Sequence, residues 1–226
     1  MAILFVDSAG VGGSVNSTTF TLTTLSPSIA GNLLIIASGY DPDTVTITGI
    51  TDDATPPNTW VHATGAKTNG TVSISSDIWY SENCKAGAMN YTITFDATAS
   101  HGEFILTEYS GVRLSGSLDS ANNIQAVASS SVGPSLTATQ AGSLIVNFAA
   151  NSDFGYTGVS APFTSRSIET ANKGLEFVDY INPPLSPQAA IFQPTSAFDY
   201  AASGAVFLPP STGPSNATKT GMFLVF

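Results

Sequence analysis

Residues 91–95 read Tyr91-Thr92-Ile93-Thr94-Phe95, with a large apolar side chain at every second position and threonine between them. A strand points successive side chains to opposite faces, so this spacing predicts a β-strand with one buried face and one solvated face. Threonine suits the solvated face because its branched carbon fits the pleat while its hydroxyl reaches water. The same alternation recurs in Phe20-Thr21-Leu22-Thr23, Val45-Thr46-Ile47-Thr48 and Val72-Ser73-Ile74-Ser75.

Turn residues separate these segments along the whole chain. Gly, Pro, Asn and Asp recur roughly every 8 to 12 residues, a spacing typical of β-sandwiches and barrels. We find no 12-residue stretch with the apolar stripe of an amphipathic helix. The sequence therefore predicts an all-β fold with almost no helix, an antiparallel, jelly-roll-like β-sandwich.

The chain also repeats itself. Three segments of the first half have counterparts in the second: Ala30–Ile36 with Ala141–Asn147, Asp77–Ser81 with Phe177–Ile181, and Gly102–Leu106 with Ser203–Phe207. One duplication with insertions accounts for all three, and each half has room for about eight strands, as in a jelly roll. We predict two similar halves packed together, residues 1–118 and 119–208, as two units or as one continuous domain.

The sequence changes character after Leu208. Residues 209–216 read Pro-Pro-Ser-Thr-Gly-Pro-Ser-Asn, which cannot form a strand ladder and predicts a linker. The last five residues, Met222-Phe223-Leu224-Val225-Phe226, are apolar without alternation, so a strand there needs burial on both faces. Two placements stay open: the strand packs on its own domain, or it adds to the sheet of a neighbouring subunit.

Charge and hydropathy exclude several classes of partner. Only 10% of residues are charged, against roughly a quarter in an average soluble domain, and the formal net charge is −10. Binding to nucleic acid or to an anionic membrane is therefore not expected. No apolar run approaches the roughly 20 residues of a membrane helix. The first apolar stretch lacks a basic region and is interrupted at Asp7, so we predict a first strand rather than a signal peptide.

Motifs that carry chemistry are missing from the sequence. The single cysteine, Cys84, cannot form an intramolecular disulfide, and no phosphate-binding loop, nucleophile elbow or zinc spacing occurs. A glycosidase pair would have to come from acidic residues such as Asp77, Glu82, Asp96, Glu103 and Glu108. Glu108 ends an apolar strand, where an acidic residue more often bonds a turn than catalyses. We expect no enzyme activity, no catalytic residue, no metal and no cofactor.

Five residues are candidates for a ligand or an ion. Asp41 and Asp43 precede a predicted strand over 44–50, and Asp52 and Asp53 follow it. Acidic loops can hold Ca²⁺, but a strand of this length separates the two pairs by roughly 23 Å, so they cannot share an ion. Trp60 is the fifth candidate, as a stacking surface for a sugar. Calcium binding and carbohydrate binding stay open as alternatives.

An ordered series of segments resembles a known module. It runs through Ala30–Ala37, Ile78–Asn83, Asn90–Phe95, Glu108–Val112 and Leu118-Asp119. The series resembles a β-sandwich module of bacteriophage virion proteins and bacterial surface proteins, over about residues 30–208. The resemblance implies a fold and a place in an assembly, and it implies no catalytic residues.

Together these features lead us to expect a non-enzymatic virion structural protein, a phage capsid decoration (cement), fibre or collar component made in the host cytoplasm without a signal peptide. Its expected partners are other copies of itself, in a homo-oligomer such as a trimer, and virion proteins such as the major capsid protein. The expected contacts are the two apolar ends: Ile3, Leu4, Phe5, Val6, Met222, Phe223, Leu224, Val225 and Phe226. The alternatives are an extracellular carbohydrate-binding or adhesin module and a filament subunit joined by strand exchange.

Overall fold

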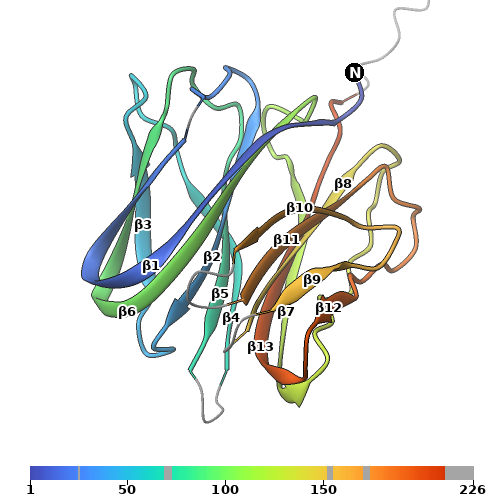
Figure 1. Ribbon diagram of the computed structural model, residues 1–226. Helices are drawn as coiled ribbons and strands as arrows, with labels where there is room; N and C mark the ends of the chain where they lie inside the picture. Colours follow the sequence, from blue (N-terminus) through green and yellow to red (C-terminus); the bar gives the residue numbers. More distant parts are fainter. Residues whose placement is uncertain (25, 69–72, 152–154, 170–173, 212–226) are drawn as a thin grey trace, which may run out of the picture.

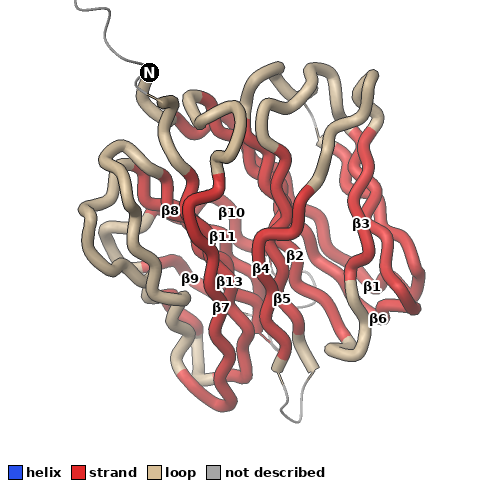
Figure 2. Tube along the Cα trace, turned by 180° about the vertical axis from the view of Figure 1, so that it is seen from behind, coloured by secondary structure: helices blue, strands red, loops and turns tan. Residues whose placement is uncertain are grey.

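The computed structural model describes residues 1–24, 26–68, 73–151, 155–169 and 174–211. Every regular element in these ranges is a β-strand (Figures 1 and 2). The strands are β1 (Leu4–Thr23), β2 (Leu33–Asp41), β3 (Ile47–Asp52), β4 (Val61–Lys67), β5 (Ser75–Ser81), β6 (Asn90–Ser110), β7 (Leu118–Ser129), β8 (Leu144–Asn151), β9 (Tyr156–Val159), β10 (Thr164–Glu169), β11 (Gly174–Ile181), β12 (Phe192–Pro194) and β13 (Phe198–Phe207). The predicted all-β class is confirmed.

Two antiparallel sheets pack face to face. The first has the order β1-β6-β2-β5-β4, with β3 paired to β6, and the second has the order β10-β11-β8-β13-β7. Side chains from both sheets, among them Ile35, Ile105, Phe148 and Phe177, fill the core between them. This arrangement is a β-sandwich, as the alternating segments predict.

The two sheets follow one plan. The second sheet reads β7-β13-β8-β11-β10 in the reverse direction, which matches the first sheet strand for strand. A bulge between Phe5 and Asp7 in β1 recurs between Leu118 and Ser120 in β7. At the opposite edges, β4 has a bulge after His62 and β10 has one after Ser165. These shared bulges show that the two sheets resemble each other in detail, beyond the general pattern of a sandwich.

The register of this repeat corrects two of the predicted pairings. Tyr80 and Asp179 occupy equivalent positions in the two sheets. Tyr80 pairs with Val61, which precedes the bulge after His62, and Asp179 pairs with Thr164, which precedes the bulge after Ser165. The predicted match of Tyr80 with Tyr180 is therefore one residue out. Tyr109 corresponds to Phe207, since they pair with Leu33 and Leu144, and the predicted match of Leu106 with Phe207 is three residues out. Strand alternation alone cannot fix register when apolar residues occupy both faces.

A further layer covers the outer face of each sheet. β1 and β6 are 20 and 21 residues long, and their paired far ends fold with β3 over the first sheet (Figure 1). There Tyr91 and Ile93 pack on Leu34 and Ile36 in a second core. β9 and β12 cover the second sheet around Tyr156 and Phe192. β1 and β6 each run through two layers as single long strands. The described residues therefore form 13 strands in all, fewer than the eight or so predicted for each half.

The second layers change the burial pattern. Tyr91, Ile93 and Phe95 alternate with less buried threonines as predicted, but all eight residues of β8 are buried, and so are the first eight of β2. The predicted strand over 44–50 lies at Ile47–Asp52 instead. The described part of the chain has no helix that is long and apolar enough to cross a membrane.

Candidate functional site

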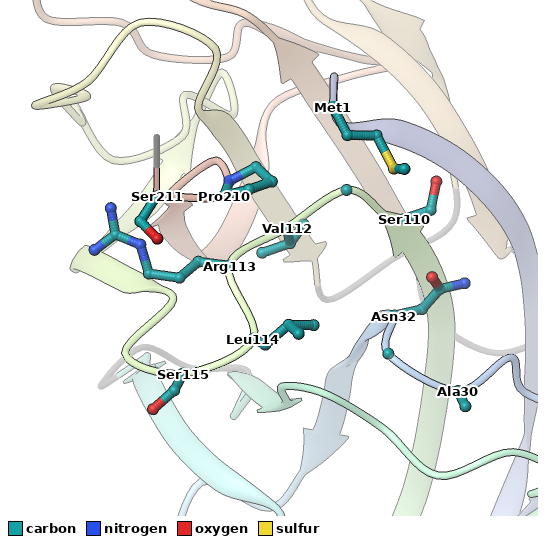
Figure 3. A pocket seen from close by; sticks show the side chains of 12 residues that line it. Met1, Ala30, Asn32, Ser110, Val112, Arg113, Leu114, Ser115, Pro210 and Ser211 are labelled. Carbon is teal, nitrogen blue, oxygen red and sulfur yellow. The ribbon is translucent and has the colours of Figure 1, made fainter. Parts of the chain in front are cut away.

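A groove of about 740 Å³ lies at the end of the sandwich where the described chain begins and where it reaches Ser211 (Figure 3). Four separate segments form its walls: the first residue, the turn before β2, the loop after β6 and the stretch after β13. The lining residues are Met1, Ala30, Gly31, Asn32, Ser110, Gly111, Val112, Arg113, Leu114, Ser115, Pro210 and Ser211.

Gly111 allows the loop after β6 to lie against the N-terminal segment. Its φ is +71°, and a Cβ there would lie 2.2 Å from the carbonyl oxygen of Ala2. Only glycine combines this left-handed conformation with so close an approach. The next residue of the N-terminal segment, Ile3, is buried in the core between the sheets. Arg113 links the loop after β6 to the stretch after β13, because its backbone N–H donates a 3.1 Å hydrogen bond to the carbonyl of Leu208.

Two glutamates hold the loops around the groove. The buried carboxylate of Glu108 accepts hydrogen bonds from the backbone N–H of Ile29 (2.9 Å) and from Nδ2 of Asn32 (2.6 Å), as expected of an acidic residue that bonds a turn. Glu82 accepts from the backbone N–H groups of Gly116 (3.0 Å) and Ser117 (2.7 Å). Burial alone would raise the pKa of Glu82, but these hydrogen bonds outweigh it and lower the pKa.

The surface of the groove is mainly apolar. Val112 is buried at its base, whereas Leu114 is 54% exposed and Met1 is almost fully exposed. Arg113 supplies a cationic side chain to the lining, beside Ser211 in Figure 3. Its guanidinium donates to Oε1 of Gln140 (3.1 Å) and forms no ion pair with the described residues. The groove is therefore an apolar hollow with the Arg113 guanidinium beside it.

The predicted ligand residues lie elsewhere, and several carry hydrogen bonds within the fold. Asp41 accepts from the Ser100 hydroxyl (2.6 Å) and the His101 backbone (3.0 Å). Asp52 accepts from Nε1 of Trp60 at 2.8 Å, and the Trp60 ring meets Tyr91 edge to face. Asp43 lies in the turn between β2 and β3.

Asp53 is held in the same way as Asp41 and Asp52. Hydrogen bonds from the backbone N–H groups of Asn90 and Met89 lower the pKa of its carboxyl to about 2. Among the residues described, no three His, Cys, Asp or Glu side chains gather as metal ligands.

The predicted contact residues divide into three groups. Ile3 is buried, and Phe5 packs against Tyr109 beneath the guanidinium of Arg166, which lies 4.4 Å from the ring centroid. Leu4 and Val6 point outward, with 59% and 37% exposure. The other five, Met222, Phe223, Leu224, Val225 and Phe226, lie outside the described residues.

The sequence analysis named Asp77 only as a possible member of a glycosidase pair and did not foresee the polar group around it. Oδ2 of Asp77 on β5 accepts one hydrogen bond from the Tyr40 hydroxyl (2.5 Å), and its Oδ1 lies 2.6 Å from Nε2 of His62. Gly65 leaves room for this carboxylate, since a Cβ there would lie 2.1 Å from Oδ1. Trp79 lies beside the half-exposed His62 ring. The trio comes from three strands and has no local motif, and the only signal is an acidic residue in the alternation of β5.

Fold and groove together define an all-β sandwich protein with an apolar groove at one end. No protein-family model, curated protein sequence or solved structure matches the chain.

Proposed function

We propose that this protein is a structural subunit of a virus particle, a capsid decoration, fibre or collar component that acts through contacts with other subunits. The observation that carries the proposal is the apolar groove, with Leu114 and Met1 exposed on it. Exposed apolar groups that cluster in a hollow favour a protein contact, whereas isolated ones need no explanation. Leu114 is about half exposed, so covering it stabilises a contact by about 1–1.5 kcal/mol, roughly half the value for complete burial of a leucine.

The polar groups near the groove support contact rather than chemistry. A site for a small polar substrate needs several polar groups that converge on it. Here Asn32 donates to Glu108, and Glu82 holds the backbone of Gly116 and Ser117. These side chains fix the shape of the loops, which suits a rigid surface that a neighbouring subunit covers.

The step from a contact surface to a virus particle comes from the sequence. It depends on the resemblance of residues 30–208 to a virion module and on the acidic, hydroxyl-rich composition. The proposed partners are other copies of the chain and virion proteins such as the major capsid protein. Leu4 and Val6, which point outward from β1, are proposed as a second contact.

Binding to assembled particles tests the proposal. Purified protein is mixed with particles released from the cells that encode it, and binding is measured by co-sedimentation. We expect the wild type to sediment with the particles and Leu114→Asp to bind at least tenfold more weakly. Leu185→Asp is the matched control, because Leu185 is 57% exposed and does not line the groove. Failure of the wild type to bind, together with its absence from purified particles by mass spectrometry, overturns the proposal.

A further inference from the structure

We infer that the groove is the seat of the segment Met222–Phe226 of the same chain. The chain itself brings this segment close to the groove. Pro210 and Ser211 belong to the groove wall (Figure 3), and Met222 follows Ser211 by eleven positions. An unstructured chain of that length spans about 18 Å between its ends, which allows a return to the point where it started.

The chemistry of the segment matches that of the groove. All five residues of 222–226 are apolar, and the transfer of each side chain out of water is favourable. The groove presents Leu114 and Met1 to solvent above the buried Val112. Its volume of about 740 Å³ is of the size that accommodates several large side chains. Docking would remove apolar surface from water on both partners.

The same copy is the favoured source of the segment. A short linker gives a tethered segment an effective concentration in the millimolar range, far above that of a second copy in dilute solution. In a particle a neighbour's groove offers the same contact, so the segment can be exchanged between copies, and the groove is then covered by a neighbouring subunit as the proposed function requires. Only this exchange step rests on the proposed function.

Disulfide trapping in the full chain tests the docking. The variant Leu114→Cys/Leu224→Cys is oxidised at micromolar concentration, and the products are separated by non-reducing electrophoresis. The control is Ile191→Cys/Leu224→Cys, because Ile191 is 55% exposed, close to the 54% of Leu114, and does not line the groove. The native Cys84 stays silent, since it is buried and its thiol pKa is raised to about 12 by burial.

We expect the Leu114 pair to close within one chain at least ten times faster than the Ile191 pair, at a rate independent of protein concentration. Equal rates for the two pairs overturn the docking. Covalent dimers as the main product, formed faster at higher concentration, overturn the assignment to the same copy. Co-sedimentation with particles is read separately, so a failed cross-link with intact particle binding refutes the docking and leaves the proposed function standing.

Discussion

The hydroxyl of Tyr109 in the first sheet donates a 2.9 Å hydrogen bond to the carboxylate of Asp179 in the second sheet. The same oxygen accepts from Nε of Arg166 at 2.7 Å, and both Tyr109 and Asp179 are buried. Burial and the nearby Asp179 charge hold the pKa of Tyr109 well above its ordinary value, so the hydroxyl stays a donor. This contact joins the two sheets, as does the buried hydrogen bond of 2.8 Å between the hydroxyls of Ser76 and Ser203.

Loss of the Asp179 charge should weaken the sandwich strongly. Asp179→Asn leaves the Arg166 guanidinium beside a neutral amide in a largely buried site, which costs about 3–5 kcal/mol of unfolding free energy. Tyr109→Phe removes one hydrogen bond and should cost about 1–2 kcal/mol. Urea denaturation measures both values, with the exposed Asp7→Asn as control. A loss below 1 kcal/mol for Asp179→Asn would show that the buried carboxylate of Asp179 contributes little to the stability of the sandwich.

Glu176 makes stability depend on pH in an unusual direction. It occupies the place in the second sheet that Asp77 has in the first, since it pairs with Ile168 and Ala149 as Asp77 pairs with Gly65 and Ser38. Glu176 is fully buried, and neither carboxylate oxygen has a hydrogen-bond partner within the described residues. Burial raises its pKa to about 7, against a smaller opposite effect of the Ser165 hydroxyl.

The sign of this dependence follows from the proton that unfolding releases. Between pH 4.5 and 7 the folded protein keeps Glu176 protonated while the unfolded chain ionises, so stability falls as the pH rises. The full effect is about 3 kcal/mol and is complete above pH 7. We expect Glu176→Gln to gain about 2–3 kcal/mol on the wild type between pH 5 and pH 8 in urea titrations. A constant difference between the two proteins across this range would contradict the prediction.

The elements of the fold were predictable from the sequence, but its layers were not. Alternation at Tyr91–Phe95 specifies a strand because the period of two is a local property. The fully buried β8 and the long β6 depend instead on what covers the sheets, and no local pattern records that. The same limit applies to the groove, whose walls come from residues as distant as Met1 and Ser211. The apolar N-terminal segment was recognised, but Ile3 is buried in the core because the bend at Gly111 admits it there.

Substitution of Gly111 should destabilise the protein more than substitution of Gly116 in the same loop. Gly111 and Gly116 both have positive φ, +71° and +62°, but a Cβ at Gly116 would meet nothing within 4 Å. Gly116→Ala should therefore cost only the conformational penalty of about 1 kcal/mol. Gly111→Ala adds a clash with the backbone of Ala2 and should cost at least 1–2 kcal/mol more.

Unfolding free energies and the rate of proteolysis near the N-terminus measure this difference. We expect the N-terminal segment of Gly111→Ala to be cleaved faster than that of Gly116→Ala. Equal behaviour of the two variants would mean that the N-terminal segment is not held against the loop.

Two asparagines on β8 should respond in opposite ways to the same substitution. Asn147 and Asn151 are both fully buried and lie on one face of the strand, four residues apart. Neither amide atom of Asn147 has a hydrogen-bond partner within the described residues, whereas Oδ1 of Asn151 accepts from the backbone N–H of Gly174 at 3.1 Å. An unpaired buried polar group costs about 1–3 kcal/mol, and its replacement by an apolar group of similar shape recovers part of that. We expect Asn147→Leu to raise the unfolding free energy by about 1 kcal/mol and Asn151→Leu to lower it by at least as much. Thermal and urea denaturation of the two variants under the same conditions decide the matter, and destabilisation by Asn147→Leu equal to that of Asn151→Leu would refute the unpaired state of Asn147.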